Sequence, residues 1–165
     1  MALVDALLPE FDREMTTTRK LLERVPDDKF EWKPHPKSMS LGQLAQHVAT
    51  IPMWGSVTIT QPGIDLGGSN QQPALKSRTD LLAAFDKHVA DTRAALKGRT
   101  DGEFMESWTL KNNGHSVFTA PKASVWRSFV MNHVIHHRAQ LSVYLRMNDV
   151  PIPSMYGPSA DEAAF

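Results

Sequence analysis

The chain has 165 residues, of which 41% are hydrophobic and 22% are charged, as expected for one globular domain spanning residues 1–165. Eighteen basic residues balance eighteen acidic ones, so neither nucleic acid nor a membrane surface is expected as a partner. The absence of cysteine excludes disulfides, zinc–thiolate sites and a cysteine nucleophile. Because no secretory signal and no run of roughly 20 apolar residues is found, we expect a soluble cytoplasmic protein.

A first helix is predicted from residue 2 to about residue 25, where apolar residues recur at steps of three and four. Pro26 ends this helix, because proline cannot continue the hydrogen-bond ladder. The following segment, 26–39, contains two further prolines and two aromatic residues. It is therefore expected to be a loop that packs on the core.

A second helix is predicted over residues 40–60. Ser40 and Gln43 have the spacing of a capping box at its start. Its predicted buried face comprises Leu44, His47, Ile51 and Trp54. Pro52 is expected to kink the helix.

A long surface connection is predicted over residues 61–77, which are rich in glycine, proline and amide side chains. Ser77 or Thr79 can then cap a third helix over residues 79–97. Its predicted buried residues are Leu82, Phe85, Val89, Thr92 and Leu96. Gly98 is a suitable residue for ending this helix.

A short β-hairpin is predicted next, with strands at residues 107–110 and 115–118 around an Asn113-Gly114 turn. Pro121 suits the first turn of a fourth helix over residues 121–147. Two prolines prevent that helix from continuing, and the tail from residue 154 is expected to be loosely held. The expected fold class is all-α, a four-helix bundle with a short hairpin before the fourth helix.

Three histidines occupy positions at which the helix periodicity calls for apolar residues. His133 and His137 stand four apart, so their Cβ atoms lie about 6 Å apart on one helix face. The predicted inward stripe of the fourth helix is Trp126, Val130, His133, His137, Leu141 and Tyr144. His47 interrupts the stripe of the second helix in the same way. The pattern predicts three imidazoles that face one core.

Buried imidazoles need polar partners, because each unsatisfied polar group costs about 1–3 kcal/mol. The sequence offers no obvious inward carboxylates to His47, His133 and His137, and one shared divalent cation would satisfy all three. Three protein ligands leave a position open for water or substrate, as in catalytic sites. The alternatives are core histidines bonded to backbone or hydroxyl groups and, for the pair on one helix, surface decoration.

Further candidates for contacts with the ligands or with substrate are His136, Arg138, Asn132, Gln140 and Trp54. The amides could orient the rings, and Arg138 could hold an anionic group or, alternatively, form a salt bridge. Trp54, Trp126 and Tyr144 could line a cavity above the metal or simply pack in the core. The remaining histidines, His35, His88 and His115, lie outside the stripes and are not expected to be ligands.

Two motifs resemble those of the DinB (DinB/YfiT-like) family of small metal-binding four-helix bundles. The first is Leu-Gly-Gln-Leu-Ala-Gln-His at residues 41–47, followed by Trp54. The second is Asn-His-Val-Ile-His-His-Arg-Ala-Gln-Leu at residues 132–141. Family members commonly have glycine where this chain has Ala139, a conservative difference outside the ligand positions. The resemblance covers essentially the whole chain, including the proline-bearing segment 150–153.

The resemblance implies an up-down-down-up bundle in which the connection between the second and third helices makes the crossover. It also implies one divalent ion on His47, His133 and His137, usually nickel or zinc, with iron or manganese as alternatives, and frequently a homodimer. Studied relatives include transferases of low-molecular-weight thiols such as bacillithiol, and a mycothiol-dependent isomerase.

The expected function is that of a metal-dependent enzyme that activates a low-molecular-weight thiol for transfer to a small-molecule substrate. The nucleophile would be the thiol, or a water molecule, at the open position of the ion. One alternative is metal-assisted hydrolysis, for which the sequence singles out no general base. The other is a non-catalytic binding or stress-response module that the ion stabilises.

Overall fold

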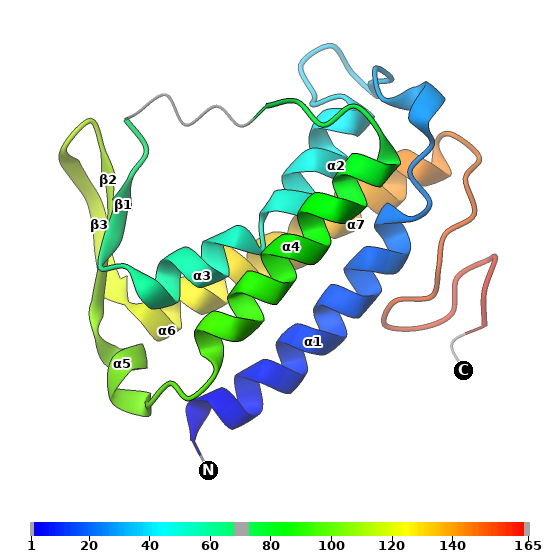
Figure 1. Ribbon diagram of the computed structural model, residues 1–165. Coiled ribbons are helices and arrows are strands. Elements are labelled where there is room, and N and C mark those ends of the chain that lie inside the picture. The colour runs from blue at the N-terminus through cyan, green and yellow to red at the C-terminus, as the bar shows by residue number, and fades with distance from the viewer. Residues whose placement is uncertain (1, 68–72, 164–165) are drawn as a thin grey trace.

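The computed structural model describes residues 2–67 and 73–163, which form a mostly helical structure with a small sheet at one end (Figure 1). The α-helices are α1 (Leu3–Leu22), α2 (Leu41–Thr50), α3 (Met53–Thr60), α4 (Arg78–Leu96), α5 (Asp101–Met105), α6 (Lys122–Val125) and α7 (His133–Arg146). A 3-10 turn, η1 (Asp27–Lys29), and a π-helical segment, η2 (Trp126–Asn132), complete the helical elements. The strands are β1 (Gly63–Asp65), β2 (Ser107–Asn112) and β3 (His115–Pro121). Within the described residues, every helix is too short or too polar to cross a membrane.

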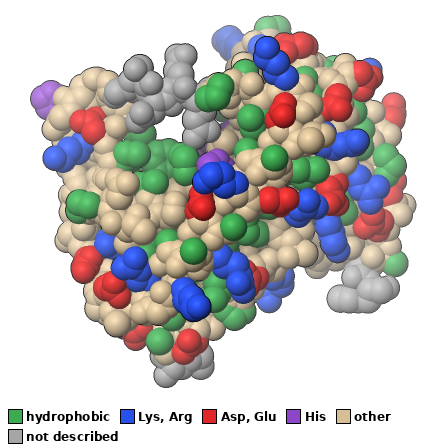
Figure 2. Space-filling view, viewed as in Figure 1, with side chains coloured by type: hydrophobic (Ala, Val, Ile, Leu, Met, Phe, Trp, Pro, Cys, Tyr) green, Lys and Arg blue, Asp and Glu red, His purple; other side chains and the backbone are tan. Residues whose placement is uncertain are grey.

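The main core lies where α1, α2, α4 and α7 pack against one another. Its fully buried side chains include Phe11, Leu22, Leu44, Val48, Phe85, Trp126 and Leu141. Each contributes about 1.5–3 kcal/mol relative to exposure, so this burial is the main force that holds the helices together. Figure 2 shows acidic and basic side chains interspersed on the face that carries α1 and α4. There Arg19 pairs with Asp86, and Arg93 with Asp12.

The predicted start signals of two helices are confirmed. The Ser40 hydroxyl accepts a hydrogen bond from the Gln43 N–H at 3.2 Å, and the Gln43 side chain accepts one from the Ser40 N–H at 2.8 Å. Ser77, rather than Thr79, caps α4 by accepting from the Asp80 N–H at 3.1 Å. These caps satisfy backbone donors that the first helical turn leaves free.

A break at Pro52 divides the predicted second helix into α2 and α3. Proline has no N–H for the helix ladder, and its ring collides with the carbonyl one turn earlier. The Thr92 hydroxyl of α4 donates to the Pro52 carbonyl at 2.6 Å and accepts from the Ser56 N–H at 3.0 Å. Gly55 permits this approach, since a Cβ there would lie 2.4 Å from Thr92 Cγ2. The two hydrogen bonds of Thr92 therefore hold the bend against α4.

The predicted hairpin is confirmed, and a third strand joins it. Asn113 and Gly114 form its turn with φ angles of 50° and 78°, which these two residue types tolerate. β1 lies in the predicted surface connection, yet it pairs in parallel with β2, while β2 pairs with β3 in antiparallel fashion. Residues 68–72 of that connection lie outside the described part of the chain. The all-α expectation is corrected to a mostly helical fold with a small sheet.

The described helices outnumber the predicted four, because Pro52 divides the second helix, α5 forms before the hairpin, and η2 divides the fourth helix into α6 and α7. Thr100 and Glu103 supply the capping box that starts α5. The up-down-down-up order that the resemblance implies stays a prediction.

The π-helical segment η2 changes which residues α7 buries. A π-helix has more residues per turn than an α-helix, so residues after η2 are rotated away from the positions that a continuous 3.6-residue period predicts. The buried residues of α7 are Val134, Arg138, Leu141 and Leu145. His133 and His137 are half-buried beside this stripe. The prediction that their rings face into the core was therefore wrong; they lie at its edge.

The C-terminal tail is tied to the bundle, contrary to the expectation of a loose end (Figure 1). Asp161 pairs with Arg146 of α7 and accepts a hydrogen bond from the Ile152 N–H. Glu162 pairs with Arg24 at 2.6 Å. Arg24 lies far from the tail in sequence, so the local composition of the tail does not predict this ion pair.

Candidate metal centre

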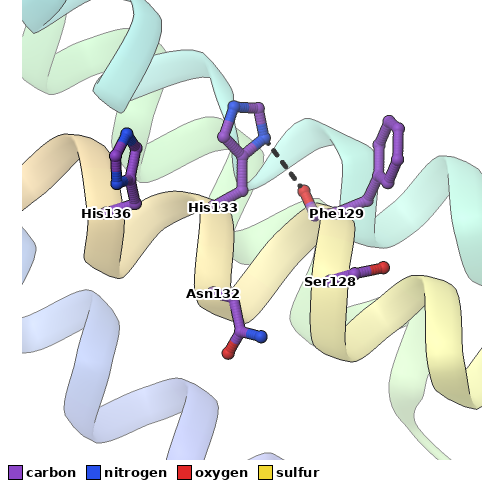
Figure 3. A pocket seen from close by; sticks show the side chains of 5 residues that line it. All are labelled: Ser128, Phe129, Asn132, His133 and His136. Atoms are coloured by element: carbon purple, nitrogen blue, oxygen red, sulfur yellow. Dashed lines mark hydrogen bonds between the residues drawn. The ribbon is translucent and has the colours of Figure 1, made fainter.

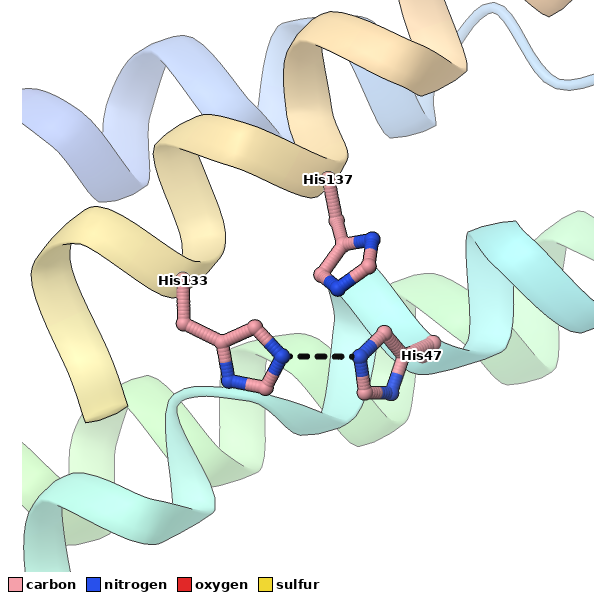
Figure 4. A group of neighbouring side chains, drawn as sticks. All are labelled: His47, His133 and His137. Atoms are coloured by element: carbon pink, nitrogen blue, oxygen red, sulfur yellow. Dashed lines mark hydrogen bonds between the residues drawn. The ribbon is translucent and has the colours of Figure 1, made fainter. Parts of the chain in front are cut away.

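Three histidines meet between α2 and α7, as Figure 4 shows. The ligating nitrogens of His47, His133 and His137 all lie within 4.8 Å of one another. His47 Nε2 and His133 Nε2 are 3.0 Å apart, and the ring centroids of His47 and His137 are 4.4 Å apart. The helical spacing of four brings two of these rings together, and the packing of α2 on α7 adds the third.

Hydrogen bonds orient the two rings of α7. His133 Nδ1 lies 3.3 Å from the Phe129 carbonyl oxygen, and His137 Nδ1 lies 2.8 Å from Gln140 Oε1. Because both partners are acceptors, each ring donates from Nδ1 and keeps a lone pair on Nε2. Such partners on the second nitrogen are typical of histidines that bind metals.

The surroundings keep the three imidazoles neutral. Burial, together with the charge that His137 and His133 can carry, lowers the pKa of His47 to about 4. Burial also lowers the pKa of His133 and that of His137. Among the described residues, no carboxylate is among the groups that shift these three pKa values. All three rings are therefore uncharged near neutral pH, the state in which imidazole binds a metal.

This arrangement fits a divalent cation. Two nitrogens bound at 2.0–2.1 Å to a tetrahedral ion lie about 3.3 Å apart. This is close to the 3.0 Å that separates His47 Nε2 from His133 Nε2. A bridging proton can satisfy the facing nitrogens of His47 and His133, but it cannot also satisfy the third histidine. A single cation can satisfy one nitrogen of each of the three histidines. Nitrogen ligands suit zinc, nickel, iron and copper, so the donor set does not select one metal.

Of the five additional candidates, the structure places Gln140 and His136 beside this centre and points Asn132 away from it. Gln140 contacts His137, and the exposed His136 ring lies 4.7 Å from the His137 ring. Figure 3 shows the rings of His133 and His136 on one side of the helix and the Asn132 amide on the other. Trp54 packs against Phe129, with ring centroids 6.3 Å apart.

Arg138 is the exception, because it pairs with Glu14 in the core and does not contact the histidine group. Its guanidinium is 1% exposed and donates to Glu14 Oε2 and to the Tyr156 hydroxyl, both at 2.7 Å. It also donates to the Glu14 carbonyl and to the Thr18 hydroxyl. The alternative reading, a salt bridge, is the one that the structure supports.

Sequence reasoning missed Glu14 and Tyr156 as partners in this cluster. A signal for Glu14 was present, because it lies three residues after Phe11 and four before Thr18, which are both buried on α1. No comparable signal marks Tyr156, which the tail brings in.

Other aromatic and histidine predictions have mixed outcomes. Trp126 does not line a cavity; it is fully buried in the main core, 5.5 Å from Phe11 between ring centroids. Tyr144 packs edge-on against Trp32. Within the described residues, the histidine group that could hold a metal consists of the three predicted positions and excludes His35, His88 and His115.

The fold and the site together define a small helical protein with a candidate three-histidine metal centre at the edge of its core. The chain belongs to the DinB family, whose sequence model matches residues 2–164. It is similar to the uncharacterized protein YrdA of Bacillus subtilis (strain 168), with 25% identity over 164 residues that cover 98% of this chain and 92% of the relative. YjoA, another uncharacterized protein of that strain, is 24% identical over 140 residues, covering 85% of this chain and 87% of the relative.

Two crystal structures share this fold. A DinB-like protein from Bacillus cereus ATCC 10987 has a TM-score of 0.71 and 21% identity, covering 92% of this chain and 97% of that one. The DinB-like protein YjoA from Bacillus subtilis has a TM-score of 0.70 and 22% identity, covering 91% and 97%. At this level of identity the likeness supports the fold alone.

Proposed function

We propose that the protein is a metal-dependent enzyme that transfers a low-molecular-weight thiol to a small electrophile. One divalent ion, nickel or zinc, would be held by His47, His133 and His137. The observation that carries this proposal is the convergence of three neutral imidazoles at a half-buried position on the surface of the bundle. A purely structural metal is normally enclosed by four protein ligands.

The ion would act as a Lewis acid. Because its three ligands are neutral, it would keep its full positive charge, which would lower the pKa of a thiol or water molecule bound at its open position. The chain itself orients the ligands through the Phe129 carbonyl and Gln140. The chain has no cysteine, so the reactive sulfur would arrive with the co-substrate.

Thiol transfer is favoured over hydrolysis by the chemistry around the rings. Hydrolysis by a metal-bound water is normally assisted by a general base, and no carboxylate of the described residues is among the groups that shift the pKa values of the three histidines. A thiolate is a strong nucleophile without such a base.

Metal analysis of protein purified without an affinity tag tests the site. We expect about one equivalent of metal per chain, retained in His88→Ala and lost in His47→Ala and His137→Ala. The control removes a half-buried histidine outside the group. Absence of metal after reconstitution with nickel and zinc would contradict the proposal.

Activity assays separate the functions. Turnover of electrophiles that requires an added thiol supports transfer, whereas turnover of esters or amides without thiol supports hydrolysis. A metal that raises the melting temperature but supports neither reaction would indicate the non-catalytic module instead.

A further inference from the structure

An aromatic wall continues the histidine group along η2. The Phe129 ring lies edge-to-face with the His133 ring, with centroids 6.4 Å apart. Trp54, from the start of α3, also packs against Phe129. Both aromatic side chains are half-buried, so part of each ring stays accessible to a ligand. An apolar surface formed by Phe129 and Trp54 therefore lies directly beside the candidate metal centre.

Phe129 is held rigidly from behind. Its ring centroid lies 5.5 Å from that of Phe118 and 6.3 Å from that of Trp108, which is fully buried between the sheet and the helices. Val125 completes this second hydrophobic cluster. A half-buried ring held in place by these contacts is preorganised to bind a flat apolar group.

The open pocket beside this ring has a volume of about 320 Å³ and is lined by Ser128, Phe129, Asn132, His133 and His136 (Figure 3). All five residues lie on the consecutive segments η2 and α7, so the pocket is an open groove whose volume suits one ring with a short substituent. None of the lining side chains is a lysine, arginine, aspartate or glutamate.

Nearby guanidinium groups are engaged elsewhere. Arg127 pairs with Glu10 at 2.5 Å, and Arg138 pairs with Glu14. In the metal-free protein, a carboxylate or phosphate on the ligand would therefore lose hydration in this pocket without gaining an ion pair. A cationic group would meet the same penalty.

We propose that this pocket binds a flat, uncharged, aromatic part of the substrate against Phe129. The substrate class is then neutral aromatic electrophiles, with the reactive atom directed toward His133. The inference rests on the proposed function for this reactive geometry, but binding in the pocket itself needs no metal.

Titration with ring compounds of one shape and different charge tests the proposal. The probes are benzamide and benzamidinium, added to the purified protein and followed by protein chemical shifts in NMR spectra. We expect benzamide to bind at least five times more tightly than benzamidinium. Equal or tighter binding of the cation would overturn the proposal.

Substitution of Phe129 locates the binding. Phe129→Leu is expected to weaken benzamide binding about two- to tenfold, because an aromatic pair contributes about 0.5–1.5 kcal/mol beyond burial. Phe30→Leu serves as the matched control, since Phe30 packs on the main core outside the pocket. Circular dichroism verifies that both variants are folded. Unchanged affinity in folded Phe129→Leu would contradict the proposal.

A charge at the rim gives a second readout that does not alter the core. Ser128 is exposed, so Ser128→Asp is expected to retain the fold and to shift preference toward benzamidinium at least threefold. No shift would overturn the pocket assignment. Benzamide and benzoate are also titrated into His47→Ala, where only benzamide is expected to bind. Benzamide binding in a protein without metal would show that the pocket stands even if the proposed metal function fails.

Discussion

Two consecutive polar residues of α7, His137 and Arg138, lie on different faces of the helix and have different surroundings. His137 lies in a half-buried group of three rings that offer nitrogens within 4.8 Å of one another. Arg138, the next residue, is buried against α1 with four hydrogen bonds from its guanidinium. A polar side chain that the protein satisfies completely serves the structure, whereas converging lone pairs at an accessible edge can serve a ligand.

The largest expected effect is on the buried face. Arg138→Met leaves the Glu14 carboxylate buried without its cation, and we expect a loss of about 3–5 kcal/mol in the free energy of unfolding. Urea denaturation measures this loss.

Arg127→Met is the matched control for that substitution. It removes an ion pair of the same chemistry between α1 and η2, but one whose arginine is 56% exposed. We expect a change of about 0–1 kcal/mol. Similar losses in both variants would show that burial of Arg138 is not what distinguishes the two faces.

A smaller effect is expected on the accessible face. Gln140→Leu removes the acceptor that orients His137, and the metal dissociation constant is expected to rise about 10- to 100-fold with little change in the stability of the metal-free protein. Competition with a chromophoric chelator measures the constant. Gln140→Glu keeps an acceptor and is expected to restore tight binding. Failure of Glu to restore it would indicate that the amide does not act through the ring.

The remaining expected effect concerns pH. The pKa of His47 falls from its ordinary value near 6.5 to about 4 on folding, and the pKa values of His133 and His137 move in the same direction. The unfolded chain then binds more protons between these values, so the stability of the metal-free protein should decrease as pH falls from about 7 to 4. His47→Gln should flatten this decrease in denaturation curves. A variant with the same acid dependence as the wild type would count against the lowered pKa.

Much of the local structure is readable from short stretches of sequence. Ser40 with Gln43 specifies the start of α2, Pro52 specifies the bend after it, and Asn113-Gly114 specifies the hairpin turn. In each case the controlling interaction is confined to a few neighbouring residues, through a cap, a missing N–H or a permitted φ angle. The histidine spacing on α7 belongs to the same category, because residues four apart share a helix face in any setting.

Tertiary packing decided the features that depend on distant partners. The sequence by itself determined which histidines can converge, but the extra residues per turn in η2 placed them at the edge of the core and turned Arg138 inward toward Glu14. β1 forms because it pairs with the edge of β2, which is distant in sequence. The tail packs on the bundle through contacts with Arg24, Arg138 and Arg146. The physical reason is that the rotation of a helix and the pairing of a strand depend on contacts made by the whole chain. A periodic pattern within one segment contains no information about those distant contacts.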